Sequence, residues 1–255
     1  MRTSKKYTRE LYRQFRYYAS WLPGTPLSLG DIGILQGKEF VKKTNLNNLN
    51  LDFEILEDST PSQISHYSKG GVSISAKIAG TAPVLGSILS EAEAGISVSF
   101  NSENSVLFKA NGTYNHTIKD QAKLAESILS LYAKGKWDKD YLVITELVEA
   151  DSSTIIISNS KDAKIELTAN ANVNLGQLDI ANADIGLSPK ISKDLYTEIV
   201  ANKGLTPLFK LSKVQTKIFQ EPIFEATKMR GMKNEQLNTG INREFDYFGE
   251  YNDIE

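Results

Sequence analysis

The stretches VSISAKIA (72–79), GISVSF (95–100) and SVLFKA (105–110) alternate apolar and polar residues, and STIIIS (153–158) and KIELTAN (164–170) repeat the pattern. A period of two gives each strand one apolar and one polar face. The two blocks predict β-hairpins. Such hairpins fit a half-buried sheet, and they also fit strands with lipid on one side and water on the other. Both interpretations remain open at this point.

The connections within the two blocks complete the prediction. NSEN (101–104) is predicted as a turn across which SVLFKA pairs back with GISVSF, and NVNLGQLDI (172–180) is predicted to continue the second block. GTAPVLGSILSEAEAG (80–95), rich in glycine and small residues, is predicted as a mobile connector. Lys77 and Glu166 fall on the polar faces. In the membrane interpretation, the apolar faces of the hairpins are formed by Val72, Ile74, Ile78, Ile96, Val98, Phe100, Ile165, Leu167, Val173 and Leu175.

The other elements predict an α+β fold. Residues 118–134 form an amphipathic helix pattern with Thr117 as N-cap and Gly135 after its end. The apolar run YLVITELVEA (141–150) predicts a central strand, and residues 195–214 predict two strands around a turn at Asn202-Lys203-Gly204. The expected architecture is a twisted mixed or antiparallel sheet with long alternating hairpins, an N-terminal basic helix and a central amphipathic helix.

The N-terminal stretch YTRELYRQFRYYASW (7–21) predicts a helix with an aromatic face and a basic face. A basic helix with interleaved aromatics suits an anionic membrane surface or nucleic acid. Alternatively, its aromatic residues dock it on the body and its arginines are merely solvated. The lipid-binding hypothesis rests on Arg9, Arg13, Arg16, Phe15 and Trp21.

The sequence contains no recognisable catalytic or cofactor motif. Asp31 follows Gly30 in a turn and is expected to be structural. His66 and His116 have no metal-ligand spacing, and no nucleophile–base pair or phosphate-binding loop is present. We therefore expect no enzyme activity, no cofactor and no metal, although a constellation assembled only in three dimensions would escape this test.

Composition narrows the class of protein. The formal charge of −2 over 255 residues predicts no general attraction to nucleic acid, and the lack of cysteine excludes disulfides and thiol chemistry. Without a transmembrane run or a signal peptide, the chain is expected to be cytoplasmic. We divide it into an α+β domain over 1–214 and a tail over 215–255. The composition changes in the tail, which is expected to be partly docked or disordered and to be a possible site for a protein partner.

The order of these elements resembles one family. SLGDIGIL (28–35) looks like the strand entry of gasdermin pore-forming domains, and the alternating blocks, the long helix, WDKDYLVITELV (137–148) and TPLFKLSKV (206–214) follow in the gasdermin order. The resemblance covers about 7–214 and points to the bacterial type.

The resemblance implies a conditional pore-forming protein. Two segments, 72–110 and 153–187, would refold into transmembrane hairpins, the basic helix would meet anionic lipid, and the C-terminal segment would hold the resting state soluble. Activated chains would form homo-oligomers at the membrane. The chain departs from the family pattern because it has no large second domain, no cysteine for acylation and no evident protease site before the tail. The alternative is a non-enzymatic protein-interaction module with the same fold and no pore activity.

Overall fold

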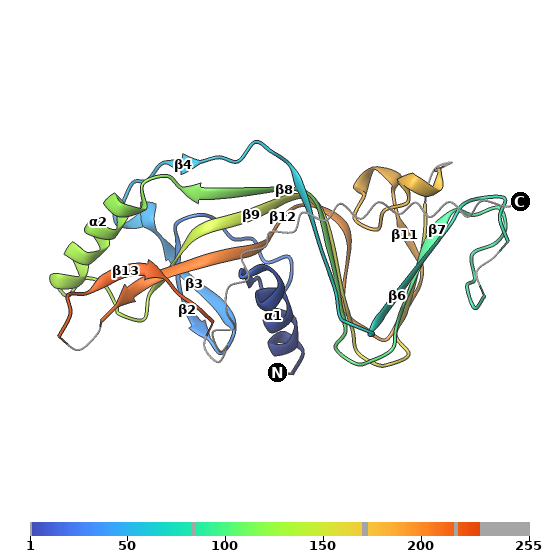
Figure 1. The fold of residues 1–255 in the computed structure, drawn as a ribbon, viewed down its shortest axis with the longest axis horizontal. Helices are drawn as coiled ribbons and strands as arrows, with labels where there is room; N and C mark the ends of the chain where they lie inside the picture. Colours follow the sequence, from blue (N-terminus) through green and yellow to red (C-terminus); the bar gives the residue numbers. More distant parts are fainter. Residues whose placement is uncertain (1, 83–84, 170–172, 217–218, 230–255) are drawn as a thin grey trace, which may run out of the picture.

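The computed structural model describes residues 2–82, 85–169, 173–216 and 219–229, and it confirms the α+β class. In this part of the chain the strands form a nine-stranded sheet, sheet A, and a four-stranded sheet, sheet B. The molecule is elongated, with α2 (Gln121–Ala133) at one end and sheet B at the other (Figure 1). The helix α1 (Arg2–Phe15) lies beneath the middle.

Sheet A is built around three long strands. β9 (Leu142–Ser158) pairs with β8 (Val106–Ile118) on one side and with β12 (Leu195–Gln215) on the other. Its remaining strands are β1 (Tyr18–Ala19), β2 (Asp31–Gln36), β3 (Glu39–Asn45), β4 (Ile55–Leu56), β5 (Ser62–Tyr67) and β13 (Ile223–Ala226). Short 3-10 helices occur at η1 (Leu46–Leu49), η2 (Leu175–Gln177) and η3 (Ala183–Ile185).

Sheet B has the strand order β11-β10-β7-β6. Its members are β6 (Val72–Lys77), β7 (Gly95–Phe100), β10 (Lys164–Thr168) and β11 (Ser188–Lys193). The predicted pairing across NSEN is wrong, because β7 pairs with β6 and β10 whereas β8 pairs with β4, β5 and β9. The predicted turn is instead a passage from one sheet to the other.

The same four chain segments run through both sheets in the same order. β5-β8-β9-β12 of sheet A continue into β6-β7-β10-β11 of sheet B, so together they form one ribbon that is folded over (Figure 1). The fold lies at residues 68–71, 101–105, 159–163 and Asp194, which we call the corner. Sheet B is therefore the continuation of sheet A, not a separate module.

Two predicted strand breaks are absent from the structure. β9 runs through residues 151–152, where the sequence analysis divided it, and β12 runs through the turn predicted at 202–204. The glycine of that predicted turn, Gly204, does have positive φ (66°), as does Ala201 (49°). The register between β12 and β9 shifts around these residues, so the local turn chemistry produces bulges within a paired strand.

Both helices differ from prediction in their bounds, α1 at both ends and α2 mainly at its N-terminal end. α1 ends at Phe15 instead of Trp21, because Arg16 adopts positive φ and Tyr18 pairs with β12. α2 is capped by Asp120, whose carboxylate accepts a hydrogen bond from the backbone N–H of Lys123, since the predicted cap Thr117 still belongs to β8.

The predicted continuation of the second hairpin is also wrong. Val173 lies in a loop and Leu175 begins η2 with 57% of its surface exposed, so neither belongs to a strand in this state. Of the segment predicted as a tail, β13 pairs with β12 and Met229 is buried, with its backbone N–H donating to the Tyr12 hydroxyl. The rest of that segment, 230–255, lies outside the described residues.

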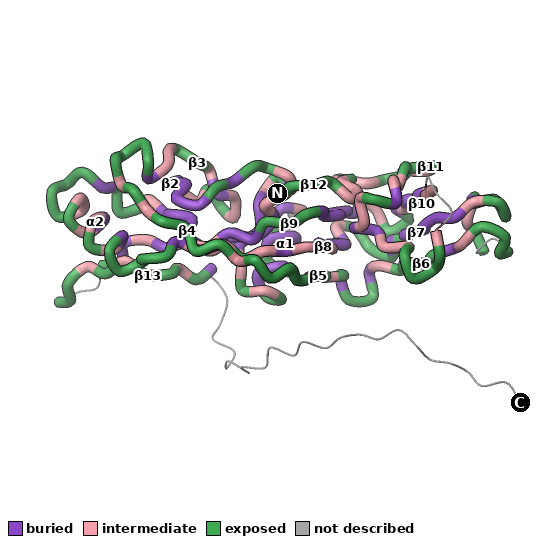
Figure 2. The backbone as a smooth tube through the Cα atoms, turned by 90° about the horizontal axis from the view of Figure 1, so that it is seen from above, coloured by how far each residue is buried: buried purple, intermediate pink, exposed green. Residues whose placement is uncertain are grey.

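Near the corner, β8 and β9 are covered on both faces. Tyr7 and Leu11 of α1 pack with Phe108 on one face, whereas Leu107 and Ile156 on the other face pack with the apolar face of sheet B. Alternate side chains of a strand point in opposite directions, so one strand pair contributes to two cores. Buried residues accordingly run along β8 and β9 into β7 (Figure 2). None of the described helices is long and apolar enough to cross a membrane.

Candidate functional site

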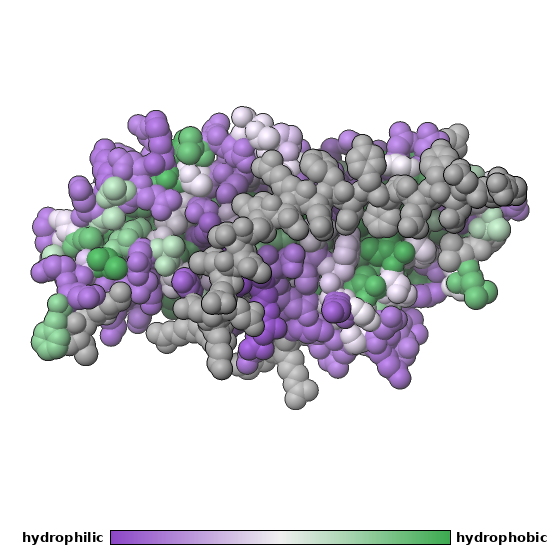
Figure 3. Space-filling view, in the orientation of Figure 1, coloured by the Kyte–Doolittle hydropathy of each residue, from purple (hydrophilic) through white to green (hydrophobic). Residues whose placement is uncertain are grey.

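The helix α1 presents a basic face to solvent. Lys5, Arg9 and Arg13 follow one another at intervals of four residues, so they form one stripe, and all three are exposed. Lys38, at the β2–β3 turn, lies close enough that its pKa is lowered, first by burial and then by the positive charges of Arg9 and Lys5. We call these four residues the basic face. Hydrophilic side chains gather over α1 in the space-filling view (Figure 3).

The other predicted lipid-binding residues are placed differently. Arg16 is exposed but follows the helix, in a left-handed conformation. Phe15 is partly buried, with its ring 6.0 Å from that of Phe108, and Trp21 lies 5.8 Å from the ring of Tyr7. In this state the two aromatics pack α1 against the body, which was the alternative interpretation, while the arginines remain available to a ligand. Lys38 was missed because it comes from a distant turn.

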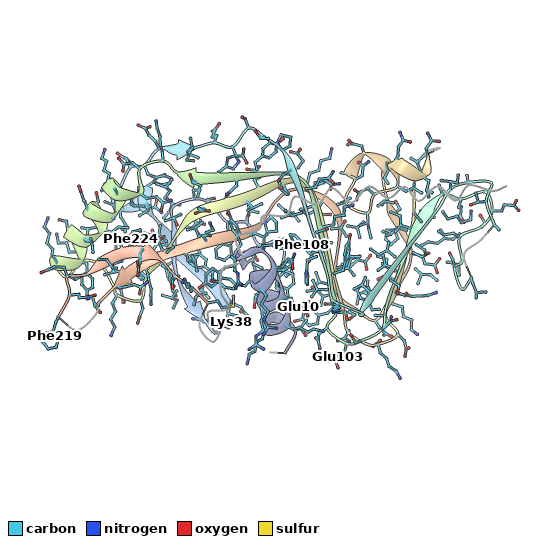
Figure 4. All side chains as sticks on the ribbon, viewed as in Figure 1. Glu10, Lys38, Glu103, Phe108, Phe219 and Phe224 are labelled. Carbon is cyan, nitrogen blue, oxygen red and sulfur yellow. The ribbon has the colours of Figure 1, made fainter. Side chains whose placement is uncertain are left out.

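A second face of α1 contacts the corner. Thr3 donates its hydroxyl hydrogen to Asn104 Oδ1 (2.5 Å), and Lys6 Nζ donates to the carbonyl of Glu103 (3.4 Å). Figure 4 labels Glu10 on α1 and Glu103 at the neighbouring corner. The N-terminal half of α1 therefore lies across the turn between β7 and β8.

Glu10 continues this contact to the neighbouring strand. Its Oε2 accepts a hydrogen bond from Ser68 Oγ (2.6 Å) and lies 3.1 Å from His66 Nε2. Burial raises the pKa of Glu10, but the hydrogen bonds from His66 and Ser68 and the charge of Lys6 outweigh it, so the net pKa is lowered. The carboxylate is thus held in its charged form at the corner.

The central strand pair keeps one register on both sides of the corner. Ser99 faces Lys164 in sheet B, and Val106 faces Ile157 in sheet A. Seven steps along the chain separate Ser99 from Val106, and seven separate Ile157 from Lys164. The corner therefore contains equal lengths of chain on the two strands, and extending it would join the two ladders without a slip.

Sheet B is amphipathic, as the alternation predicted. Its apolar face contains seven of the predicted hairpin residues: Val72, Ile74, Ile96, Val98, Phe100, Ile165 and Leu167. All of these except Ile74, which is 43% exposed at the edge strand β6, pack against the body in one cluster. Ile78 lies one residue beyond β6 and is half-buried.

The polar face of sheet B is not simply open to solvent. Lys77 and Glu166 are only 3% and 2% exposed, because part of the predicted mobile connector, residues 85–94, folds back over them. Lys77 Nζ donates to three backbone carbonyls, two of them in this segment. Residues 85–94 of the connector are therefore docked, because the charges of the sheet supply their hydrogen bonds.

Asp31 is structural, as expected from its turn. Its carboxylate is fully buried, accepts hydrogen bonds from the Ser28 backbone N–H and Asn45 Nδ2, and lies 2.7 Å from Lys42 Nζ. These partners join residues 28–31, which lead into β2, to the neighbouring strand β3. Local sequence does not reveal these partners, because they lie across a strand pair.

The described residues contain no group of three or more His, Asp and Glu side chains arranged to hold a metal. His66 contacts Glu10, and the second histidine, His116, accepts a hydrogen bond from the backbone N–H of Asp58. Open cavities of contrasting character lie among the described residues. One is lined mainly by apolar side chains such as Ile64 and Val148, and the other by polar ones such as Asp151.

Comparison with known proteins gives a match among solved structures. No family model and no curated protein matches this chain. Among solved structures, it is similar to a bacterial gasdermin from Bradyrhizobium tropiciagri, with 15% identity over 86% of this chain and 89% of that chain and a TM-score of 0.34. The match agrees with the resemblance found in the order of elements. At this TM-score it carries no argument about activity, which must come from the geometry of the chain itself.

Proposed function

We propose that this chain is a conditionally membrane-inserting, pore-forming protein of the gasdermin type. In the resting state the four-stranded ribbon is folded over at the corner. On activation the corner extends, and sheet B swings out as two amphipathic hairpins that enter the bilayer. The described structure is the resting state of this cycle.

The observation that carries the proposal is the shared register of the central strand pair. If the two ladders were out of register, extension of the corner would force the backbone groups on one side of it to change their hydrogen-bond partners. Here the ladder between β7 and β10 is in phase with that between β8 and β9. A transmembrane strand needs about 9–11 residues, so the six-residue strands β6 and β7 must lengthen when they insert.

The outer strands support the same movement. Tyr67 faces Leu107, and Val72 faces Phe100. Across the corner, the chain from Tyr67 to Val72 is therefore two residues shorter than the opposite chain from Phe100 to Leu107. An even offset keeps every side chain on its original face, whereas an odd one would invert the apolar and polar faces. On the other side, Leu195 faces Ser158 and Lys193 faces Lys164. The chain between Lys193 and Leu195 is therefore four residues shorter than the opposite chain, which is again an even difference.

The basic face gives the chain a way to approach its target. Basic residues near an anionic membrane surface each contribute about 1 kcal/mol to binding, and Lys5, Arg9 and Arg13 point to solvent on α1. The same helix contacts the corner through Glu10 and Lys6. We propose that anionic lipid binds this face, that the chain is cytoplasmic before it binds, and that residues 230–255 hold it inactive.

A pore requires several chains. Among the described strands, none pairs with the outer edges of β6 and β11 in sheet B. Such edges are templates for strands of another chain. We propose that activated copies associate edge to edge as a homo-oligomer.

The test is release of dye from vesicles. A protease recognition sequence is placed after Met229, because the described fold reaches that residue, and the folded full chain is then cleaved. Cleaved protein is expected to release dye from vesicles containing phosphatidylserine and not from phosphatidylcholine vesicles, and uncleaved protein is expected to release little from either. No release by cleaved protein that is still folded would reject pore formation and favour the interaction module.

A further inference from the structure

Residues 85–94, which we call the strap, are bound to the polar face of sheet B by buried charges. Glu166 Oε2 accepts hydrogen bonds from Ser87 Oγ and from the backbone N–H of Ile88, both at 2.8 Å. Lys77 Nζ donates to the carbonyls of Glu91 (3.1 Å) and Glu93 (2.8 Å). A nearly buried charge with several hydrogen bonds is stable only while its partners stay in place.

An apolar contact completes the docking of the strap. Leu89 is 2% exposed although the strap lies on a polar face. It reaches the sheet beside Gly95, where a Cβ atom would lie 3.0 Å from Leu89 Cδ1 and 2.1 Å from the carbonyl oxygen of Leu167. The glycine leaves room for the strap at this point. Lys190 adds an ion pair to Glu93 at 2.6 Å.

Sequence alternation continues from the strands into the segments at both ends of this connector. SEAEAGISVSF (90–100) places Ala92 and Ala94 on the face of Ile96, with Glu91 and Glu93 on the opposite face. VSISAKIAGTA (72–82) keeps the same alternation of small or apolar residues with mostly polar ones. In the register of β6 and β7, residues 78–82 would lie opposite 90–94. The sequence therefore encodes two strands of eleven residues, of which the structure pairs six in each.

The missing length matters for membrane insertion. A strand of six residues spans about 20 Å, whereas the hydrocarbon core is about 30 Å thick and requires about 9–11 residues. Residues 90–94 would supply that length, but in the described state only Ala94 continues the ladder, with its carbonyl accepting from the Ala169 backbone N–H (2.9 Å), and Lys77 holds Glu91 and Glu93 at the polar face. The same residues cannot bind the polar face and extend β7.

We infer that the strap is an internal lock: Lys77 and Glu166 hold it on sheet B, and its release extends β6 and β7 to the length of membrane strands. The inference rests on the proposed function and adds a step that precedes insertion. Released Lys77 and Glu166 remain on the polar face of the lengthened hairpin, where water solvates them. The inserted state therefore contains no buried charge at these two positions.

A removable crosslink tests the inference. Ser87 Oγ and Ser97 Oγ lie 3.4 Å apart and the chain has no native cysteine, so Ser87→Cys with Ser97→Cys places a single disulfide between strap and sheet. The folded full chain with the cleavage sequence after Met229 is oxidised, cleaved and added to phosphatidylserine vesicles. The oxidised protein is expected to release no dye, and reduction is expected to restore release. Each single-cysteine variant, oxidised in the same way, is the control.

A second variant measures the lock without reference to pores. Removing the acceptor with Glu166→Ala is expected to speed amide exchange in residues 85–94 of the full chain by about tenfold or more, whereas the exposed Glu126→Ala is expected to leave it unchanged. After cleavage, Glu166→Ala is expected to release dye faster than the parent protein.

The outcomes separate the two proposals. If oxidised and reduced proteins release dye equally, or if faster exchange leaves the rate of release unchanged, the strap is not a lock and pore formation stands. If the parent and the reduced variant are both silent after cleavage, the proposed function fails and the lock falls with it. Unchanged exchange in Glu166→Ala would show that Glu166 does not hold the strap.

Discussion

At the scale of single residues, Asp31 carries the clearest energetic consequence. It is fully buried and accepts hydrogen bonds from Ser28, just before β2, and from Asn45, at the end of β3. Asp31→Ala would leave the Ser28 N–H without its acceptor, remove one of the two acceptors of Asn45 Nδ2 and break the ion pair with Lys42, so we expect a loss of about 3 kcal/mol in the free energy of unfolding. Urea denaturation measures it, with the exposed Asp52→Ala as control. Equal losses in the two variants would contradict this role.

Glu10 makes the attachment of α1 depend on pH. Its pKa in the folded state is lowered, below an unfolded value of about 4.3. The stabilisation is therefore complete above that unfolded value and is lost as pH falls through the folded-state pKa. We expect Glu10→Gln to cost about 1 kcal/mol at pH 7 and less at pH 3.5. The difference between the variants, measured by urea denaturation, should shrink on acidification. A constant difference would contradict the assignment.

The basic face is tested by charge removal on α1. Arg9→Ala with Arg13→Ala is expected to weaken binding to phosphatidylserine vesicles by about 2 kcal/mol, roughly thirtyfold, and this loss should diminish at high salt. Vesicle sedimentation measures it. Lys136→Ala with Lys139→Ala makes the same change of charge at exposed sites between α2 and β9 and should have little effect. Equal weakening by both pairs would indicate only a general charge effect.

At the scale of elements, the corner makes the proposal specific. Inserting a single Gly after Glu103 adds one residue to an exposed turn on one strand, so extension of the corner would join the two ladders one residue out of register and exchange the apolar and polar faces of β7. We expect the resting fold to tolerate it and release of dye to be largely lost. A second single Gly after Lys161, in the opposite turn, restores equal lengths and should restore release. If the single insertion leaves release unchanged, the ladders do not join.

Elements also show what the sequence could and could not predict. Alternation identified β6, β7 and β10 because the pattern is local, and the stripe of α2 was equally evident. Pairing was mispredicted at NSEN because a strand ending at a turn can return beside itself or pass to another sheet, and local alternation is the same in both cases. The turn at Asn202-Lys203-Gly204 was overridden by a long pairing with β9.

The candidate site was predicted in part for the same reason. Arg9 and Arg13 are neighbours on one helix, so spacing alone placed them together. Lys38, the contact of Glu10 with His66, and the burial of Lys77 and Glu166 depend on segments far apart in the sequence. Alternation predicted which face these last two side chains occupy, but not that the strap covers that face.

At the scale of the whole molecule, the proposed cycle gives the four-stranded ribbon two shapes, one folded over at the corner and one extended. In the described shape, α1 covers one face of β8 and β9, and sheet B covers the other. Extension would remove the contact with sheet B and the hydrogen bonds from α1 to the corner, and would leave the apolar face of sheet B to the bilayer. The burial of this face in the resting state and its exchange for lipid are two uses of the same alternation.

The most direct measurement is the distance across the corner. Spin labels at Ser99→Cys and Asn115→Cys, both exposed positions, are sixteen residues apart on β7 and β8. Pulsed electron paramagnetic resonance should give a shorter distance in solution, where the chain reverses at the corner, and about 50 Å, the length of an extended strand, after cleavage on phosphatidylserine vesicles. The same short distance on vesicles that are releasing dye would contradict the central claim that the ribbon extends.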